Sequence, residues 1–260
     1  MPNDMTSIHH PGGNRVSEEE WDVRVKLAAA YRLVDYFGWT EQIYGHLTAR
    51  VPGPEHHFLI NPWGLNFEEV TASNLVKIDV DGKVIEGAHP VNHAGFVIHS
   101  AVHMTRSEEN FVVMHTHTRA GMEIAALKEG LLPISMFATV FHGRLGYHDY
   151  EGASLYLDER ARIVESLGPH KAVMMRNHGL MAVGRTVPEC FLRLYRLERA
   201  CQVQLDAAAA GTLNLLGSAV AEKSAADLDA YQAMQPTPEG EIEFAALMRK
   251  LDKIDPSYRT

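Results

Sequence analysis

The sequence predicts a single α/β domain, and three observations lead to that prediction. Short apolar runs that suit strands alternate along the chain with longer segments of helical spacing. The 260 residues are enough for one large domain with its own core, and no linker or internal repeat divides them. The glycine-rich phosphate loops and the Gly-x-Ser-x-Gly elbow of several common α/β enzymes do not occur. We expect a flexible lead-in over residues 1–16 and a folded domain over residues 17–255.

Helix and strand signals follow one another closely in the first half of the chain. Ser17 and Glu20 form a capping box, and the helix that they open continues to about Phe37. Asp81 and Gly82 are typical of a tight hairpin turn. Beyond the first helix we expect strands at 43–51 and 57–60, a turn at 62–64, a helical turn at 71–75, a strand at 76–80, a helix at 92–106 and a strand at 111–118.

The second half of the chain is richer in helical signals. Pro188 suits the first turn of a long helix that runs to about Ala210. The last five or so residues have no periodic pattern, so we expect them to be loose. The other expected elements are a helix at 119–128, strand and loop at 131–146, an amphipathic helix at 155–167, strands at 171–175 and 180–183, and helices at 224–234 and 239–251.

Composition and charge exclude several classes of protein. The net charge of −9 argues against a nucleic-acid partner, which would require a basic surface. No run of about 18 apolar residues occurs, so no membrane span is expected. The N-terminus lacks the basic-then-apolar pattern of a signal peptide. Cys190 and Cys201 fall roughly 16 Å apart along one expected helix, which is too far for a disulfide bond. These features favour a cytoplasmic protein.

A pair of histidines ends the apolar run Phe111-Val-Val-Met-His115-Thr-His117. Residues two apart in a strand project to the same face, so His115 and His117 would lie roughly 7 Å apart at their backbones. That spacing allows both imidazoles to reach one metal ion at Zn–N distances of about 2.1 Å. An H-x-H pair can also serve surface polarity or hydrogen bonding in a core, and the pair alone does not decide between these roles.

A third histidine, His178, follows the apolar run Val173-Met-Met and precedes Gly179, which we interpret as the turn that aims its side chain. Three neutral imidazoles at the ends of two strands suit Zn²⁺ or a similar divalent ion. His99 and His103 lie four residues apart on the expected helix and could share a metal, but packing of that helix is the favoured interpretation. The sequence therefore predicts a metal site at His115, His117 and His178.

Five segments in this order resemble the class II aldolase/adducin family: Ile60-Asn-Pro-Trp-Gly64, Asn92-His-Ala-Gly-Phe-Val-Ile-His99, His115-Thr-His117, Tyr147-His-Asp-Tyr150 and Arg176-Asn-His-Gly179. Each motif is short, but five in register over roughly residues 20–210 make a specific match. Within the family, three segments resemble the adducin branch more than the sugar-phosphate aldolases: Ala94-Gly-Phe-Val-Ile-His, Gly130-Leu-Leu-Pro-Ile-Ser135 and Tyr147-His-Asp-Tyr-Glu-Gly152.

The resemblance implies a three-layer α/β/α domain with a central, largely antiparallel sheet. It also implies that His115, His117 and His178 bind a divalent metal ion, with Zn favoured and Mn, Co or Fe as alternatives. Members of the family act on small molecules, and they often form tetramers with sites at subunit borders. We therefore expect a small-molecule substrate and a homo-oligomer, with a tetramer favoured by the resemblance.

The chain departs from the aldolase pattern at the groups that move a proton and hold phosphate. Aldolases of the family have a catalytic glutamate four residues before the histidine that matches His99, and Gly95 stands there. The preceding pair, usually phosphate-binding serines, is His93-Ala94. The threonine of the aldolases' phosphate-binding Thr-Gly is replaced by Trp63. The metal-binding pattern is thus retained, whereas the proton-transfer and phosphate-binding patterns are lost.

These departures lead to our functional expectation, a metal-dependent lyase with aldolase-like or decarboxylase-like chemistry. Its substrate would be a small, non-phosphorylated carbonyl or carboxylate compound. Decarboxylation needs less proton abstraction than an aldol step because CO₂ leaves as the electron acceptor forms. The acid/base is not identified; Tyr147, His148, Asp149 and Tyr150 are candidates, although a packed polar loop is the favoured interpretation of that cluster.

Two further hypotheses stay open at this point. The chain could be an adducin-like binding or scaffold domain with a vestigial metal pocket, although a scaffold would have no use for three convergent imidazoles. It could also be a metal-dependent isomerase or epimerase of the same family. A metal assay on the purified protein separates the first of these from an enzyme.

Overall fold

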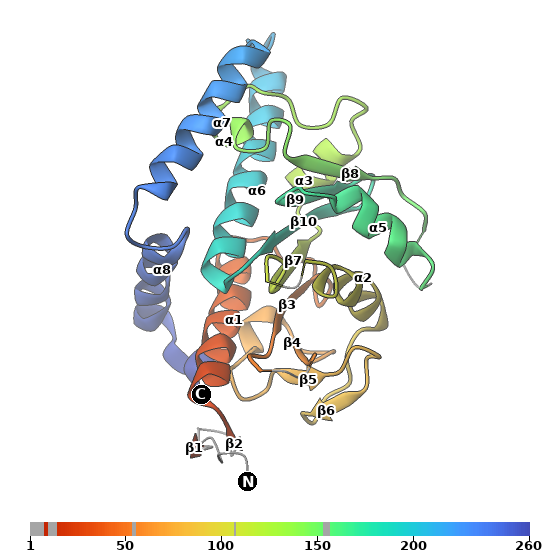
Figure 1. Cartoon of the computed structure of the whole chain (residues 1–260), viewed down its shortest axis with the longest axis vertical. Helices are drawn as coiled ribbons and strands as arrows, with labels where there is room; N and C mark the ends of the chain where they lie inside the picture. The colour runs from red at the N-terminus through yellow and green to blue at the C-terminus, as the bar shows by residue number, and fades with distance from the viewer. Residues whose placement is uncertain (1–7, 10–14, 54–55, 107, 153–156) are drawn as a thin grey trace.

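A central sheet of eight strands organises the computed structural model, which describes residues 8–9, 15–53, 56–106, 108–152 and 157–260 (Figure 1). The strand order is β6-β5-β4-β3-β7-β10-β9-β8, and the neighbours are antiparallel except for the parallel pair β8–β9. The expected largely antiparallel sheet is confirmed. Its strands are β3 (His46–Arg50), β4 (Phe58–Ile60), β5 (Val76–Ile78), β6 (Val84–Glu86), β7 (Val112–Thr116), β8 (Leu145–His148), β9 (Ala172–Met175) and β10 (Gly179–Gly184).

Helices cover both faces of this sheet and complete a three-layer α/β/α domain (Figure 1). Helices α2 and α5 pack on one face, whereas α1, α3 and α6 pack on the other. The expected three-layer fold and single domain are therefore confirmed. The helices are α1 (Glu18–Tyr36), α2 (His93–His103), α3 (Arg119–Ala125), α4 (Met136–Thr139), α5 (Glu159–Leu167), α6 (Val187–Ala210), α7 (Ser218–Ala233) and α8 (Glu241–Ile254).

The alternation of side chains along the central strands decides which residues reach which layer. In β7, Val112 and Met114 join the core beneath α1 and α6, whereas Val113 joins the core beneath α2 and α5. His115 continues the alternation of Val113, so its imidazole points to the α2 side. The same rule sends His46 of β3 to that side, because His46 and His115 are paired across the ladder. Strand register thus places two histidines next to each other on one face.

The capping box predicted at the start of α1 forms only in part. The Ser17 hydroxyl accepts a hydrogen bond from the Glu20 backbone N–H at 3.1 Å, as a cap requires. The Glu20 carboxylate does not complete the box, because it accepts bonds from Arg24 at 2.9 Å and Lys77 at 2.8 Å. Tertiary ion pairing therefore takes the glutamate away from the local motif.

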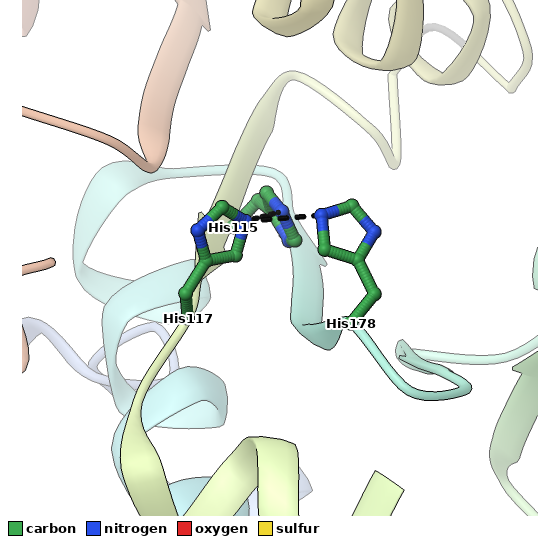
Figure 2. Close-up of side chains that lie close together, drawn as sticks. All are labelled: His115, His117 and His178. Atoms are coloured by element: carbon green, nitrogen blue, oxygen red, sulfur yellow. Dashed lines mark hydrogen bonds between the residues drawn. The ribbon is translucent and has the colours of Figure 1, made fainter. Parts of the chain in front are cut away.

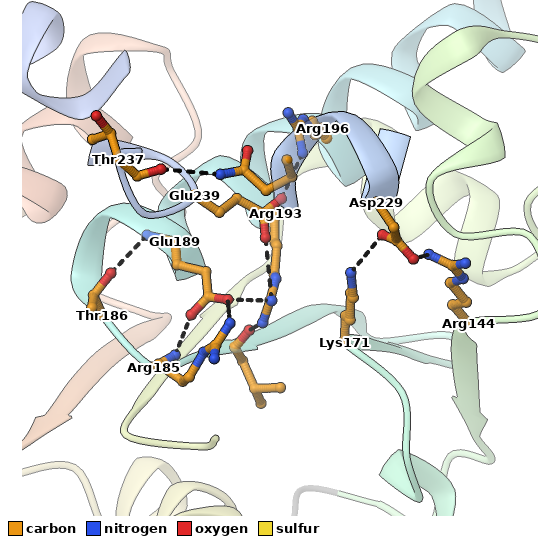
Figure 3. A network of polar contacts seen from close by, with 12 residues as sticks. Arg144, Lys171, Arg185, Thr186, Glu189, Arg193, Arg196, Asp229, Thr237 and Glu239 are labelled. Carbon is orange, nitrogen blue, oxygen red and sulfur yellow. Dashed lines mark hydrogen bonds and ion pairs between the residues drawn. The ribbon is translucent and has the colours of Figure 1, made fainter. Parts of the chain in front are cut away.

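Salt bridges attach the C-terminal helices to the rest of the domain (Figure 3). Asp229 of α7 pairs with Arg144 at 2.5 Å and with Lys171 at 3.3 Å. Glu239, just before α8, accepts a hydrogen bond from Arg196 of α6 at 2.8 Å. These ion pairs add to the apolar contacts of Phe244, Leu251 and Tyr258, which belong to the main core and anchor the C-terminal segment.

Several expected element boundaries were wrong. The segment expected as strand and loop at 131–146 contains the short helix α4, and α7 begins at Ser218, six residues before the expected start. The last residues are ordered, not loose: the Tyr258 carbonyl accepts a bond from Ala72 N–H and the Thr260 carbonyl from Ser73 N–H, both at 2.9 Å. The Tyr258 side chain is fully buried. Backbone pairing with residues 72 and 73 is a long-range contact that a local pattern does not reveal.

The remaining expectations concern the N-terminus, the cysteines and the membrane. Within the expected lead-in of residues 1–16, Ile8–His9 pairs with Arg15–Val16 as a two-stranded sheet, whereas residues 1–7 and 10–14 lie outside the described part. Cys190 and Cys201 are both buried in α6, and both are free thiols, as predicted. Within the described ranges, no helix combines the length and the apolar character that crossing a bilayer demands.

Candidate metal centre

Strand β7 delivers the first two histidines of the predicted site. His115 is the fourth residue of the strand, and only 1% of its surface is exposed. His117 lies one residue beyond the strand end, and Thr118 then caps α3 by accepting a hydrogen bond from Gly121 N–H at 3.1 Å. The strand therefore holds His115 rigidly within the sheet, while the beginning of α3 fixes the position of His117.

His178 enters from the turn between β9 and β10, and the local backbone differs from our expectation. Asn177, not Gly179, has the left-handed conformation of this turn, with φ of 55°. Asparagine is one of the few non-glycine residues that adopt this region readily. The backbone N–H groups of Asn177 and His178 donate to the carbonyls of Ala125 at 3.2 Å and Met175 at 3.1 Å. These bonds aim the His178 ring at the end of β7.

Gly179 contributes close packing to the turn. A Cβ atom at this position would lie 2.4 Å from the Thr116 carbonyl oxygen, 3.3 Å from His117 Cδ2 and 3.4 Å from His115 Cε1. Contacts below 3.0 Å with backbone atoms force the chain to move. A glycine at the first position of β10 therefore lets this strand approach the histidine-bearing end of β7.

The three rings meet at one point, as Figure 2 shows. The Nε2 atom of His117 lies 2.8 Å from Nε2 of His115 and 3.0 Å from Nε2 of His178. The potential ligand atoms of all three side chains lie within 4.8 Å of one another. The structure thus brings together the three residues that the sequence singled out.

A backbone contact determines which nitrogen of His115 is free to bind an ion. Its Nδ1 atom lies 2.9 Å from the carbonyl oxygen of Leu180, which can only accept a hydrogen bond. Nδ1 therefore carries the proton, and Nε2 presents its lone pair to the other two rings. Metal-binding histidines commonly use the second nitrogen in this way, because the bond fixes both tautomer and ring orientation.

Burial keeps the three imidazoles neutral. Desolvation lowers the pKa of His115 well below its usual value, and the neighbouring His117 and His178 lower it further. Desolvation also lowers the pKa of His117, and it lowers that of His178 to about 4. Neutral imidazoles are the form that binds a metal ion.

This donor set fits a divalent cation. Three nitrogen donors at the ends of two central strands leave further coordination positions open, which is the arrangement of catalytic zinc sites. Among the described residues, the cluster of side chains able to hold an ion at this point consists of histidines alone, without a carboxylate. Borderline-soft nitrogen ligands of this kind suit Zn²⁺ better than Mg²⁺ or Ca²⁺.

His99 and His103 serve the packing of α2, in agreement with the favoured interpretation. The Thr48 hydroxyl of β3 lies 2.7 Å from His99 Nδ1 and 2.6 Å from His103 Nε2. His103 Nδ1 contacts the Asn110 carbonyl oxygen at 2.9 Å, and the His103 ring stacks on Phe58. These bonds tie α2 to the sheet.

The acid/base candidates separate into two groups. The Tyr147 hydroxyl accepts a bond from Leu131 N–H at 3.1 Å, and the Tyr147 ring lies under the Arg176 guanidinium. The buried His148 contacts Ser166 Oγ at 3.0 Å and Glu159 Oε1 at 3.3 Å. Both are therefore engaged in packing. Tyr150 is different, because its ring centroid lies 6.2 Å from that of His178 and 56% of its surface is exposed.

The structure adds two residues to this region that sequence patterns did not indicate. His46, paired with His115 across the ladder, is buried, and its ring lies 5.9 Å from that of His99. Glu41, in the segment between α1 and β3, is the carboxylate whose charge partly offsets the desolvation that lowers the pKa of His117. A lone histidine at a strand start and an acid in a loop carry no spacing signal, so only the fold reveals them.

Comparisons with known proteins agree on one family. The family model for the Class II Aldolase and Adducin N-terminal domain matches residues 25–205. The crystal structure of an aldolase II superfamily protein from Pseudomonas syringae is similar with a TM-score of 0.87 and 45% identity, covering 95% of this chain and 98% of that one. L-fuculose 1-phosphate aldolase from Glaciozyma antarctica has a TM-score of 0.79 and 29% identity, covering 93% of each chain. Alpha-adducin of Rattus norvegicus is 42% identical over 92% of this chain, which corresponds to 34% of the adducin.

Proposed function

Because this chain belongs to the class II aldolase and adducin family, we propose that it is a metal-dependent lyase. The reaction would be an aldolase-like or decarboxylase-like cleavage of a carbon–carbon bond in a small, non-phosphorylated carbonyl or carboxylate compound. The observation that carries this proposal is the convergence of three Nε2 atoms. Nε2 of His117 lies 2.8 Å from that of His115 and 3.0 Å from that of His178. The family implies a divalent ion, commonly zinc.

The proposed roles of the histidines follow from their surroundings. His115, His117 and His178 would hold the ion, and His115 is kept in the correct tautomer by the Leu180 carbonyl. When bound, the ion supplies Lewis-acid stabilisation of negative charge on a substrate oxygen. Burial of His115 within the sheet excludes water from one side, so the substrate would approach from the half-buried side of His117 and His178.

The side chains at the positions of the aldolases' phosphate site support a substrate without a phosphate. Trp63 presents an indole that lies 5.7 Å from the Tyr44 ring, where the aldolases have a threonine. The exposed His93 packs its ring 6.0 Å from that of Phe96. These positions therefore lack the small hydroxyl donors with which the aldolases surround a phosphate. A carbonyl or carboxylate group requires fewer of them.

We propose Tyr150 as the residue that contacts the substrate above His178. Its exposed ring stands beside the metal centre, whereas Tyr147 and His148 are already engaged elsewhere. A phenolic hydroxyl can donate to or accept from a substrate oxygen. With Gly95 in place of the family's glutamate, proton transfer from that position is lost. Decarboxylation, which depends least on such a transfer, is therefore the favoured reaction type.

The experiment that tests this proposal combines metal analysis with a substrate screen. The purified protein, dialysed and then loaded with Zn²⁺, Mn²⁺, Co²⁺ or Fe²⁺, is offered small hydroxy and keto acids while CO₂ and aldehyde products are measured. We expect turnover that requires the metal and is lost in His178→Ala. Stoichiometric metal without turnover of any such acid would contradict the lyase proposal.

A binding or scaffold role is the second candidate, and the similarity to alpha-adducin is the observation that favours it. This chain spans about a third of the adducin, so the activity of the whole adducin does not transfer to it. Absence of stoichiometric metal after loading would favour this role over the lyase.

We also propose that the protein works as a homo-oligomer in the cytoplasm. Support comes from the free thiols Cys190 and Cys201 and from aldolase relatives that are often oligomeric. Light scattering on the purified protein tests the oligomer directly. A monomer at micromolar concentration would contradict it.

A further inference from the structure

The ring of His46 lies where a side chain at position 95 would have to begin. A Cβ atom added to Gly95 would lie 2.6 Å from His46 Cγ, 2.7 Å from Cδ2 and 2.9 Å from Nδ1. Real Cβ atoms do not approach other atoms this closely. The first of these atoms, Cγ, is the root of the imidazole and not its flexible end, so a rotation of the ring would not relieve the contact.

The sheet and α2 hold this arrangement from both sides. His46 begins β3 and is paired with His115, and only 4% of its surface is exposed. Two residues further along the same face, Thr48 bonds His99 and His103 of α2 at 2.7 and 2.6 Å. These contacts fix the distance between the start of β3 and the first turn of α2, so the gap cannot widen freely.

The proton positions in the hydrogen-bond network of His99, Thr48 and His103 follow from its last acceptor, the Asn110 carbonyl. Because the Asn110 carbonyl can only accept, His103 Nδ1 donates to it, and His103 Nε2 then accepts from the Thr48 hydroxyl. The Thr48 oxygen in turn accepts from His99 Nδ1–H, which leaves the lone pair of His99 Nε2 directed away from Thr48.

Two imidazole nitrogens therefore stay without a partner. Among the described residues, neither His99 Nε2 nor His46 Nδ1 has a hydrogen bond, and both are buried. An unsatisfied buried polar atom is unfavourable for folding, and most proteins keep few of them. His46 Nδ1 therefore costs stability, while Nε2 on the other side of the ring lies 3.5 Å from Asn92 Nδ2.

The location of His46 connects it to the proposed reaction. Burial lowers the pKa of His46 and of His115, and the neighbouring His117 and His178 lower both further. The ring of His46 therefore lies in the same electrostatic environment as the three Nε2 donors of the metal centre. Any acidic side chain reaching this point from position 95 would enter that environment as well.

We propose that His46 is a specificity-determining residue, because its ring occupies the place of a side chain at position 95 and so excludes a carboxylate from that side of the metal centre. The steric part of this inference is independent of the proposed function, whereas the consequence for reaction type rests on it. A site closed in this way favours substrates whose bond breaks without proton abstraction from the α2 side.

A double-mutant cycle tests the steric part without metal or substrate. At a helical position such as Gly95, in the first turn of α2, glycine-to-alanine replacement normally stabilises. Because of His46, we expect Gly95→Ala to lower the thermal midpoint of the metal-free protein by roughly 3–10 °C. In the His46→Ala background, the same replacement should raise the midpoint. The control is Gly217→Ala, where a Cβ meets nothing within 4 Å, and it should have the same small effect in both backgrounds.

A second arm tests the consequence at the metal centre with Co²⁺ as the probe. We expect Gly95→Glu to lose folded protein or Co²⁺ uptake, and His46→Ala/Gly95→Glu to take up as much Co²⁺ as His46→Ala alone. An increase of the midpoint by Gly95→Ala with His46 present would overturn the proposal, as would full Co²⁺ uptake by Gly95→Glu. If the parent protein binds no Co²⁺, the proposed function fails while the midpoint cycle still decides the role of His46.

Discussion

The Nδ1 atom of His115 lies 2.9 Å from the carbonyl oxygen of Leu180, so the second residue of β10 determines which nitrogen of His115 faces the other histidines. This contact joins two strands that are 65 residues apart in the chain. It makes the metal centre a property of the β7–β10 pairing and not of the H-x-H motif alone. Changes in that pairing should therefore affect metal binding.

Gly179→Ala tests the close approach of β10 to β7. The added Cβ would meet the Thr116 carbonyl oxygen at 2.4 Å, so the two strands would have to separate. We expect the free energy of unfolding to fall by about 1–3 kcal/mol, as in other overpacked sites. Chemical denaturation of the metal-free protein measures this. The control is Gly217→Ala at the N-cap of α7, where an added Cβ meets nothing within 4 Å and only the weaker capping of alanine is felt, so it should cost less. An unchanged stability of Gly179→Ala would show that the strands have more room than we infer.

The turn that carries His178 provides a second test. Asn177 has a φ of 55°, a region that glycine adopts freely and a β-branched residue does not. Asn177→Gly should leave the free energy of unfolding within about 0.5 kcal/mol, whereas Asn177→Val should lower it by about 1–2 kcal/mol. The comparison of the two variants by denaturant titration isolates the backbone conformation. Equal stabilities would mean that the turn is not left-handed at this residue.

Glu198, which bonds Thr118 next to the metal centre, should make the stability of the protein depend on pH. It accepts hydrogen bonds from Thr118 at 2.5 Å and Gln202 at 2.9 Å, and burial raises its pKa above the usual value. A raised pKa in the folded state means that the native protein holds the proton more tightly than the unfolded chain. The contribution of Glu198 to the free energy of unfolding is therefore complete below a pH of about 4.3, and it is lost as the pH rises through the pKa of the folded state.

Replacement of Glu198 by glutamine should remove that dependence. We expect the stability of Glu198→Gln relative to the parent protein to increase from pH 4 to pH 7, and we propose urea titrations of both metal-free proteins across that range. Titration of the neighbouring histidines is common to both and cancels in the difference. A difference that stays constant with pH would contradict the raised pKa.

Removal of His178 and of His103 should have opposite consequences. His178 contributes one of the three convergent Nε2 atoms, so His178→Ala should abolish metal retention on dialysis. His103 bonds Thr48 and Asn110 within the core, so His103→Ala should lower stability but leave the metal content nearly intact. Metal analysis of both variants beside the parent protein decides this. Loss of metal in His103→Ala with retention in His178→Ala would place the site on α2.

The sequence predicted those features that follow from local pattern and from motif order. Strand periodicity placed His115 and His117 on one face, and the family resemblance indicated the three-layer fold with an antiparallel sheet. The structure agrees with the fold and brings His178 to the same point. The H-x-H motif was informative because a strand of period two leaves little freedom in where its side chains point.

Other features depend on contacts between distant segments and left no local signal. His46 lies beside the metal centre because strand register pairs it with His115. Gly95 leaves room for the His46 ring, and this contact is visible only in the three-dimensional structure. The turn at Asn177 was assigned to Gly179 because glycine is the more common left-handed residue. Tyr258 appeared loose because its partner is the backbone of Ala72.

Zinc-edge anomalous diffraction from Zn²⁺-soaked crystals of the unmodified protein is the most direct test of the metal centre. We predict one strong anomalous peak per chain, about 2.1 Å from Nε2 of His115, His117 and His178. The distances identify the ligands independently of activity, stability or substrate. A peak located elsewhere, or full occupancy by zinc with any of the three rings turned away from it, would contradict the account.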